Sequence, residues 1–445
     1  MAVTHQGPKG TRDFYPDAMA VRRHIEHAWR SASIDCGFDE IEGPTYEHLS
    51  LYTAKSGPGI VNELFSFRRA GGDDDYALRP EFTPTLARMV AAKAASLPMP
   101  VKWFAMPVHF RAERQQRGRL REFVQWNVDL LGIKGGAADA EVIGCAVLAM
   151  ERLGLKPADV RVRLSHRGAV ASALSALGVA AEKIAEAFEL LDRRDKLEPM
   201  EFDKRALALG LTALARAQFE KLTAAKLPMD ASIETLAQHL GVAEEALVGA
   251  DDLSQRLQAM DLAAWCEWDF GIVRGLAYYT GTVFEVHAVR AGERAIAGGG
   301  RYDGLVELFG GPKMPAIGFG MGDVVLGLVL GDLGLLPQDA LALLPRPDAY
   351  LLCDGSEAAE CALPQLLMSL RRAGLHARSS WKATRNIGKL LGDAGKARAR
   401  FAVILGTELA EGAVTVKDLQ GGEQIKLPLA EVVRHIAQAA RTTRS

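Results

Sequence analysis

The chain of 445 residues is too long for one ordinary hydrophobic core, so two or three domains are expected. Hydrophobic residues make up 49% and charged residues 24%, which is ordinary for a soluble globular protein. The formal net charge of -2 gives no overall attraction to nucleic acid, so any RNA binding would require local basic patches.

The cysteines and the N-terminus exclude several further classes. The 5 cysteines show neither CxxC spacing nor an even-numbered framework, which argues against structural zinc and against disulfides. The N-terminus lacks the apolar segment of a signal peptide, and no apolar run is long enough to span a bilayer. These features predict a cytoplasmic protein without a membrane contact.

A helix, a strand and a strand-to-helix corner are expected before residue 100. Residues from about 18 to 36 have helical spacing, and GFDEIEGP follows as a short strand that stops at Pro44. In YALRPEFTPTLARMVAA, a strand should end near Pro80 and a helix should begin near Thr83, with Thr83 as its cap and Pro84 in the first turn. Glu81 at this corner is either a ligand that faces a cleft or a carboxylate that stabilises the helix end.

The segment 102–131 predicts an antiparallel hairpin with a long basic tip. Two strand-like runs, KWFAMPVHF and FVQWNVDLL, flank an arginine-rich loop. Along the second strand, Gln125, Asn127 and Asp129 share one face by the two-residue period, while apolar residues share the other. Arg111 and Glu113 stand where the first strand meets the loop, so a planar, permanently charged guanidinium could bind a phosphate there. An edge hairpin with a solvated face is the alternative.

The middle of the chain changes composition twice. From about 168 to 262, Ala, Leu, Glu and Lys recur at helical spacing, which predicts a helical insertion with a mixed-charge surface. WDFGIVRGLAYYTGTVFEVHAV then has strand-like runs around Arg274, which needs a carboxylate or a bound anion, so a structural ion pair is the alternative to a functional role. In AIAGGGRYDGLVELFGG, three glycines between a strand and a helix permit close approach of a ligand or form a plain tight turn.

A separate α/β domain is expected at the C-terminus. After LLPQDALALLPRPDAY, strands and helices alternate over residues 345–445, a normal domain size. Between Arg371 and Arg400 there are nine Lys or Arg and a single acid, Asp393. This bias favours a patch for a polyanion, with a solvated helix face as the alternative.

Several of these segments resemble signature motifs of class II aminoacyl-tRNA synthetases, in the form found in histidyl-tRNA synthetases. FR.ER…GR.REF.Q…D..G resembles the second class II motif, and LRPE.T, VRGLAYYTGTVFE and GGGRYDGL resemble segments that bind histidine in that family. The helix, strand and Pro44 near the N-terminus resemble the first motif, which forms the dimer interface of the family. The C-terminal segment resembles the anticodon-binding domain of several class II synthetases.

The resemblance implies an α/β fold: a catalytic domain with an antiparallel sheet at 1–167 and 263–335, a helical insertion at 168–262, and an anticodon-binding α/β domain at 345–445. It implies that Arg111 and Arg274 are catalytic. It implies that histidine is bound by Glu81, Thr83, Arg111, Gln125, Asp129, Arg274, Tyr278, Tyr279 and Tyr302. It implies that ATP is bound by Arg111, Glu113, Arg119 and Arg121.

The third class II motif departs from the family pattern. In MPAIGFGMGDVVLGLVL, the position that usually carries an arginine for the ATP γ-phosphate is Val325, and Val324 replaces the preceding glutamate. Asp323 is expected to cap the following apolar helix. The hypothesis for the triphosphate tail is Mg²⁺ together with Arg119 or Arg121 of the loop.

The predicted function is ATP-dependent ligation of L-histidine to tRNA(His) through a histidyl-adenylate. The implied partners are L-histidine, ATP with its Mg²⁺, tRNA(His) and a second copy of the chain, and no permanent cofactor or protein-bound metal is expected. The alternative is a synthetase-like regulatory subunit of ATP phosphoribosyltransferase, which the altered third motif favours. The intact GGGRYDGL and the basic C-terminal domain argue against it, and a simple RNA-binding module would need no such pocket.

Overall fold

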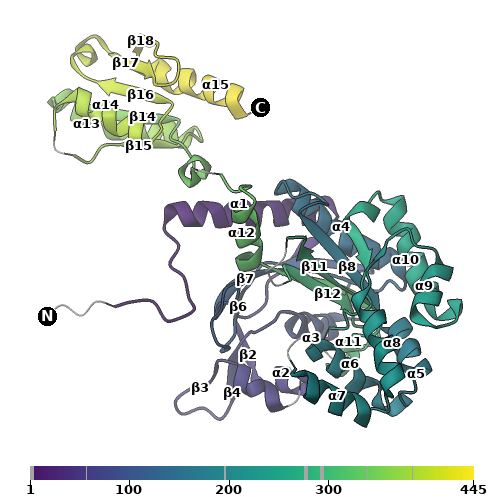
Figure 1. Cartoon of the computed structure of the whole chain (residues 1–445). Helices are drawn as coiled ribbons and strands as arrows, with labels where there is room; N and C mark the ends of the chain where they lie inside the picture. Colours follow the sequence, from purple (N-terminus) through teal and green to yellow (C-terminus); the bar gives the residue numbers. More distant parts are fainter. Residues whose placement is uncertain are drawn as a thin grey trace. The chain divides into compact units, whose positions relative to one another are not determined.

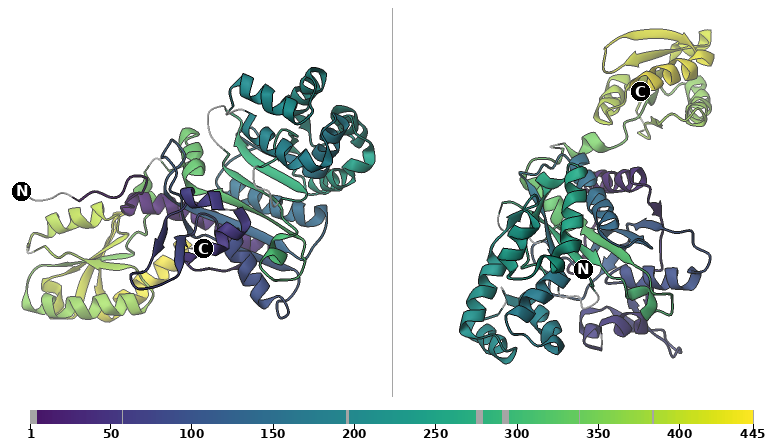
Figure 2. Two further views of the ribbon diagram at one scale, coloured as in Figure 1. Left: turned by 90° about the horizontal axis from the view of Figure 1, so that it is seen from below. Right: turned by 90° about the vertical axis from the view of Figure 1, so that its right-hand side faces the viewer.

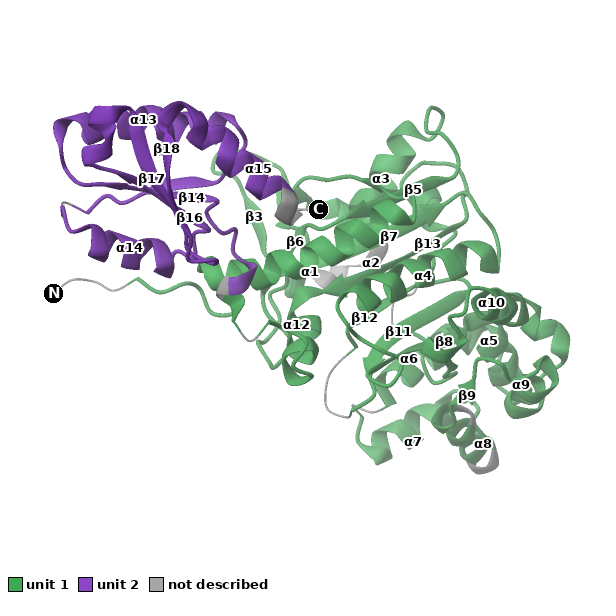
Figure 3. Ribbon diagram, turned by 90° about the horizontal axis from the view of Figure 1, so that it is seen from above, with its two compact units in different colours: residues 1–340 green, residues 341–445 purple. Residues whose placement is uncertain are grey.

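The computed structural model describes residues 5–56, 58–194, 197–274, 279–290, 295–337, 339–382 and 384–444. The chain divides into two units, residues 1–340 and 341–445 (Figure 3). The described hydrophobic residues form separate cores in the two units.

A ten-stranded, largely antiparallel sheet runs through the first unit in the order β1-β5-β7-β13-β12-β11-β8-β10-β9, with β6 paired to β7. Only β1 with β5 and β8 with β10 pair in parallel among its described strands. The mixed α/β class and the antiparallel sheet predicted from the sequence are therefore confirmed. The strands are β1 (Asp39–Glu40), β5 (Val101–Ala105), β6 (Val108–Phe110), β7 (Glu122–Leu131), β8 (Val160–His166), β9 (Leu227–Pro228), β10 (Cys266–Trp268), β11 (Thr282–Ala288), β12 (Ala297–Arg301) and β13 (Ala316–Gly322).

The predicted hairpin is confirmed, with one correction. KWFAMPVHF is two strands rather than one, because Pro107 lacks an N–H and cannot continue the ladder. The carbonyl of Pro107 instead accepts from the backbone N–H of Gln125 at 3.1 Å. Both β5 and β6 still pair antiparallel with β7, so the basic loop at 111–121 joins neighbouring strands.

Helix α1 (Pro16–Asp35) packs with α4 (Gly136–Arg152) on the apolar face of the sheet. Proline in the first turn of α1 costs no hydrogen bond, which lets the helix begin at residue 16, near the predicted start. Trp29 stacks on Trp126 of β7 at a centroid distance of 5.9 Å, and Trp126 Nε1 donates to Ser33 Oγ at 2.9 Å. These contacts place Trp126 on the core side of β7. The side chains that alternate with Trp126 therefore face the opposite side of the sheet.

The helices of the insertion segment gather beside β8, at the side of the sheet away from β6 (Figures 1 and 2). The segment is mainly helical, and the short strand β9 adds antiparallel to β10, so it also extends the sheet. Leu253 and Leu257 lie in the same core as the sheet. Its helices are α5 (Arg167–Ala176), α6 (Ile184–Arg193), α7 (Pro199–Ala208), α8 (Ala213–Ala224), α9 (Ile233–Leu240) and α10 (Val248–Ala259).

A small sheet in the order β2-β4-β3 lies near α2 and α3 in the same unit (Figure 1). The strand expected to run to Pro44 is shorter than predicted and ends at Glu40. The chain then pairs again as β2 after Pro44. These elements are β2 (Tyr46–His48), α2 (Leu49–Ser56), β3 (Ser66–Arg68), β4 (Asp75–Leu78) and α3 (Thr83–Lys93).

The second unit is a five-stranded sheet in the order β15-β14-β16-β17-β18 with helices packed on it. The predicted α/β pattern is confirmed, and β18 and α15 are additional elements. Side-chain caps begin two helices: Ser356 accepts from the Ala359 N–H at 3.4 Å, and Asn386 from the Lys389 N–H at 3.0 Å. The elements are β14 (Ala349–Cys353), α13 (Glu357–Arg372), β15 (Ala377–Ser379), α14 (Ile387–Lys396), β16 (Phe401–Leu405), β17 (Ala413–Asp418), β18 (Gln424–Pro428) and α15 (Val432–Arg444).

Candidate functional site

A cavity of about 70 Å³ lies over the middle of the large sheet, on the face opposite α1 and α4. Its walls come from β7, β12 and β13, from the start of α3 and from the loops after β6 and β10. It combines charged, amide and aromatic side chains with a glycine-lined floor. The lining residues are Glu81, Thr83, Arg111, Gln125, Asn127, Arg274, Tyr279, Gly298, Tyr302, Gly318, Phe319 and Gly320.

The alternation of β7 sets the polar side of this cavity. Gln125 and Asn127 line it, whereas Val124, Trp126 and Val128 lie in the hydrophobic core. The two-face prediction for this strand is therefore confirmed. Asn127 is a lining residue that the sequence placed on the polar face but did not select as a ligand, although its position two residues from Gln125 was sufficient signal.

Glycines of β12 and β13 make room for the polar side chains. A Cβ on Gly318 would overlap Asp129 Oδ1, a Cβ on Gly320 would lie 2.5 Å from Gln125 Nε2, and a Cβ on Gly298 would overlap Arg274 Nη1. The glycines 298–300 lie inside β12, so their predicted place between a strand and a helix is wrong. They act as the floor of a cavity, where a backbone without side chains lets neighbouring groups approach.

Arg111 crosses the cavity from the end of β6. Its Nε donates to the Pro80 carbonyl at 3.1 Å, and its guanidinium lies 5.0 Å from the ring centroid of Phe123. Burial lowers the pKa of Arg111, while Glu81 and Glu113 oppose that change. Because an arginine keeps its proton even when its pKa falls, the site contains a fixed, partly desolvated positive charge.

Tyr302 lines the cavity and its hydroxyl donates to Asp129 Oδ1, while Asp129 lies beside Gly318 and is not itself one of the lining residues. Burial raises the pKa of Asp129 to about 7, and the hydrogen bond from Tyr302 limits the rise. Burial and the neighbouring carboxylate raise the pKa of Tyr302 well above its ordinary value. The pair therefore presents a carboxyl group whose proton is exchangeable near neutral pH.

Arg274 reaches the cavity from the loop after β10, and its Nη1 donates to Glu285 Oε1 at 2.8 Å. The ion pair that the sequence raised as an alternative is thus present, and Arg274 nevertheless lines the cavity together with Tyr279. Glu285 gave no sequence signal of its own, because its partner lies across a loop. Tyr278, predicted beside Tyr279, lies outside the described residues.

Glu81 and Thr83 lie at the corner between β4 and α3, as predicted, and both line the cavity. The predicted helix cap is wrong. Helix α3 begins at Thr83 itself, so the capping position belongs to Phe82, and no side-chain cap is made there. The Thr83 hydroxyl is consequently available to the cavity wall rather than to the helix end.

Of the residues predicted to bind ATP, Arg111 lines the cavity, whereas Glu113, Arg119 and Arg121 lie in the loop between β6 and β7 and are not among the lining residues. Arg119 forms an ion pair with Glu113, and Arg121 Nε lies 3.4 Å from the Glu113 carbonyl. The backbone N–H of Arg121 donates to Gly10 O at 2.9 Å, which joins the N-terminal segment to the base of the loop. The loop thus carries several cations at one side of Arg111.

The third motif shows another correction. The cap of α12 (Asp323–Asp332) is Gly322, and the carboxylate of Asp323 is turned to other partners. It accepts from the Val124 N–H at 3.0 Å and pairs with Arg12 at 2.6 Å, which ties α12 to β7 and to the N-terminal segment. Val325 is buried in the core, so an apolar residue at that position contributes packing.

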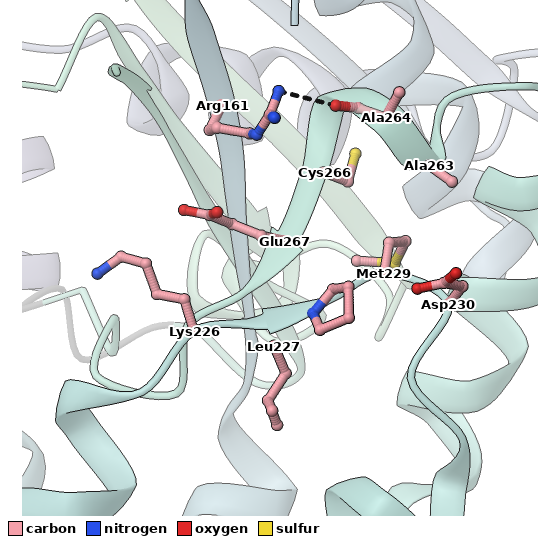
Figure 4. A pocket seen from close by; sticks show the side chains of 10 residues that line it. Arg161, Lys226, Leu227, Met229, Asp230, Ala263, Ala264, Cys266 and Glu267 are labelled. Carbon is pink, nitrogen blue, oxygen red and sulfur yellow. Dashed lines mark hydrogen bonds between the residues drawn. The ribbon is translucent and has the colours of Figure 1, made fainter. Parts of the chain in front are cut away.

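A larger cavity of about 400 Å³ lies at the sheet edge formed by β9 and β10 (Figure 4). Three of its charged side chains already have protein partners. Arg161 donates to the Ala264 carbonyl at 2.8 Å, Lys226 pairs with Asp269, and Glu267 with Arg163. The smaller cavity on β7 is therefore the better candidate site. The motif residues line it, and Asp129, whose pKa is shifted, lies beside it. Among the described residues, no group of three or more His, Cys, Asp or Glu could hold a metal ion.

Comparison with known proteins gives near full-length matches. A family model described as Histidyl-tRNA synthetase matches residues 10–322, and one described as Anticodon binding domain matches residues 354–439. The histidine–tRNA ligase of Opitutus terrae is 39% identical, with 97% of each chain covered. That of Halobacterium salinarum is 36% identical over 95% of each chain, and the chloroplastic/mitochondrial enzyme of Arabidopsis thaliana is 34% identical over 96% of this chain and 85% of its own.

Solved structures share the fold. Histidyl-tRNA synthetase from Nostoc sp. PCC 7120 matches with a TM-score of 0.76 and 24% identity, covering 98% of this chain and 100% of that one. A structure from Bacillus halodurans C, described as an ATP phosphoribosyltransferase regulatory subunit/histidyl-tRNA synthetase, matches with a TM-score of 0.71 and 22% identity, covering 92% and 100%. In the described part of the chain, no helix is long and apolar enough to cross a membrane. The family models and the curated relatives together show that this chain belongs to the histidyl-tRNA synthetase family.

Proposed function

We propose that the chain ligates L-histidine to tRNA(His) in two steps, through a histidyl-adenylate. The observation that carries this proposal is the convergence of Arg111, Arg274, Glu81 and Gln125 on one glycine-floored cavity. Two cations beside amide and carboxylate groups suit a substrate pair in which an amino acid meets a phosphate. The family of the chain and the names of its relatives support the same reaction.

Histidine fits the cavity by the chemistry of its three polar groups. Glu81, at the rim near α3, suits the α-ammonium group, with Thr83 and Gln125 as further hydrogen-bond partners. The Asp129–Tyr302 pair suits an imidazole N–H, and Tyr279 supplies an aromatic wall. A buried polar pair penalises apolar amino acids, because it would be left without partners. Tyr278 is proposed to join this group.

The two arginines are proposed to stabilise charge in the first step. A carboxylate oxygen of histidine attacks the α-phosphorus of ATP, and the bond from that phosphorus to the bridging oxygen breaks to release pyrophosphate. Arg111 and Arg274 would bind the α-phosphate and the histidine carboxylate, which lowers their mutual repulsion. In the second step, a ribose hydroxyl of the tRNA end attacks the histidyl carbonyl carbon and AMP leaves.

The arginine-rich loop is proposed to hold the rest of ATP. Arg119 and Arg121, with Glu113 between them, lie beside Arg111, and the Mg²⁺ that ATP carries would neutralise further phosphate charge. In this proposal the loop arginines take the role of the arginine that the family usually has at the position of Val325.

Replacing Arg119 and Arg121 together with alanine should raise the KM for ATP about tenfold or more. An unchanged KM would transfer this role to other residues.

The remaining parts of the chain are proposed to serve tRNA. Residues 345–445 would bind the anticodon through the basic stretch 371–400, residues 168–262 would approach the acceptor arm, and residues 1–167 with 263–335 would form the catalytic domain. The cytoplasm as location and a homodimer through the α1 region are proposed from the family.

The decisive experiment is histidine-dependent exchange between ATP and pyrophosphate on the purified protein, with Mg²⁺ and without tRNA. Exchange that requires histidine, followed by charging of tRNA(His), is expected. Histidine binding without exchange would instead favour the regulatory subunit of ATP phosphoribosyltransferase, for which the Bacillus halodurans structure and Val325 are the specific observations.

A further inference from the structure

Three side chains form a continuous polar chain that ends at the cavity. Arg274 Nη1 donates to Glu285 Oε1 at 2.8 Å, and the other oxygen, Glu285 Oε2, lies 2.8 Å from His287 Nε2. Glu285 and His287 are two residues apart on β11, so their side chains rise from the same face of the sheet. Each of the three side chains is about one-fifth exposed, between 21% and 23%.

Arg274 has an unfavourable backbone conformation, and its neighbours hold its side chain in one place. Its φ of 53° lies in the left-handed region, which is unfavourable for residues that carry a Cβ. A long side chain on a loop would otherwise sample many rotamers. Its guanidinium instead rests over Gly298 of β12, where any Cβ would overlap Nη1. The loop, β11 and β12 therefore define one position for this group.

The charges around the cavity also favour a carboxylate next to Arg274. Arg274 and Arg111 line the same small cavity, and the charge of Arg274 is among the causes that lower the pKa of Arg111. Two such cations repel one another, so each requires a nearby anion. Although burial favours its neutral form, the hydrogen bond from His287 and the charge of Arg274 hold the pKa of Glu285 at about 2. Glu285 is accordingly a permanent carboxylate at neutral pH.

We propose that Glu285 is the positioning residue for Arg274 in the adenylation step, and that His287 orients the Glu285 carboxylate through its second oxygen. This inference rests on the proposed function. Glu285 contacts Arg274 rather than the reacting atoms, so it acts on the reaction by keeping the guanidinium in place before substrate arrives. The preorganised cation then stabilises charge without first having to reorganise.

The test measures histidine-dependent ATP–pyrophosphate exchange in the wild type, Glu285→Gln, Glu285→Ala, Arg274→Ala, the double variant Glu285→Ala with Arg274→Ala, and His287→Ala. Glu285→Gln should lower kcat about 10- to 100-fold, while the KM values for histidine and ATP change by less than about threefold. Since Glu285 acts through Arg274, the double variant should be no slower than Arg274→Ala alone. His287→Ala should cause a smaller loss, of about three- to tenfold, in the same direction.

The matched control is Glu141→Gln on α4. Glu141 pairs with Lys102 of β5 at 2.6 Å, and the two side chains are 37% and 24% exposed, so this ion pair resembles that of Glu285 with Arg274, but neither of its members lines the cavity on β7. Its exchange rate should stay within about twofold of the wild type. If the control lost exchange activity to a comparable degree and also lost thermal stability, the effect at Glu285 would be explained by general destabilisation.

Two further results would overturn the inference. One is near-normal exchange by Glu285→Gln, and the other is a multiplicative loss in the double variant, which would mean that Glu285 acts independently of Arg274. Both presuppose exchange by the wild type. Absence of histidine-dependent exchange in the wild type would refute the proposed function itself, so the two failures are distinguishable.

Discussion

At the scale of single residues, Asp129 is the most informative group because its burial changes its acid–base behaviour. The side chain is 4% exposed, and its Oδ1 is hydrogen-bonded by Tyr302. The sequence shows that Asp129 shares a strand face with Gln125, but it does not show how deeply the Asp129 side chain is buried. Burial came from β13, whose glycine at 318 lies directly beside the carboxylate.

Asp129 predicts a pH-dependent contribution to stability. Its pKa of about 7 in the folded protein exceeds the ordinary value of 3.8, so between these values the folded state binds more protons than the unfolded state. The free energy of unfolding should therefore fall as pH rises through this window, by up to ~1.4 kcal/mol per pH unit. Asp129→Asn should flatten this slope in urea unfolding measured between about pH 5 and about pH 7. An unchanged slope would show that the proton is held elsewhere.

Replacing Arg111 with lysine should reduce activity with little loss of stability. Lysine keeps the charge but not the planar fork that packs over Phe123 and is proposed to bind phosphate. Arg111→Lys should reduce kcat/KM for pyrophosphate exchange about 100- to 1,000-fold. Arg117→Lys is the control, because Arg117 lies in the same loop, is 63% exposed and pairs with Asp332. Near-normal exchange by Arg111→Lys would show that a point charge suffices.

At the scale of elements, the glycine-rich strand β13 limits what the cavity can hold. A Cβ at Gly318 would overlap the Asp129 carboxylate and approach the Val128 carbonyl to 2.8 Å. Gly318→Ala should lower the free energy of unfolding by about 1–3 kcal/mol and abolish histidine activation. Gly327→Ala in α12 meets only Ile25 Cδ1 at 4.0 Å, so it should be neutral or stabilising by up to about 1 kcal/mol. Chemical denaturation measures the stability of both variants, and pyrophosphate exchange measures their activity. If Gly318→Ala and Gly327→Ala changed stability and activity equally, the glycine floor of the cavity would have no special role.

Errors in the predicted elements arose in two opposite ways. Pro107, Gly298 and Asp323 each have a local preference, for a break, for a turn and for a helix cap respectively. In the fold, Pro107 did break the strand, but the glycines lie within β12 and Asp323 binds Arg12 and the Val124 N–H. Local preference therefore prevailed at Pro107, and partners from other elements prevailed at Gly298 and Asp323.

At the scale of the whole molecule, the two units have separate cores, which predicts separable activities. A fragment of residues 1–340 should fold and retain pyrophosphate exchange within about tenfold of the full chain, since every described lining residue of the cavity belongs to it. Charging of tRNA(His) should fall much further, because the basic stretch 371–400 is absent. The measurements are exchange and aminoacylation on the same fragment, and equal losses in both would contradict this division.

Features that depend on near neighbours could be predicted from the order of the residues. Helix α1, the alternation of β7 and the α/β order of residues 349–418 follow from spacing, and the motif residues indicated the chemistry. Which distant side chains meet depends on the complete fold: Tyr302 with Asp129, Arg274 with Glu285 and Arg12 with Asp323. The physical reason is that periodicity specifies the face of each strand, whereas strand order and register specify its partners. The depth of Asp129 and the support of Arg274 arise from those partners.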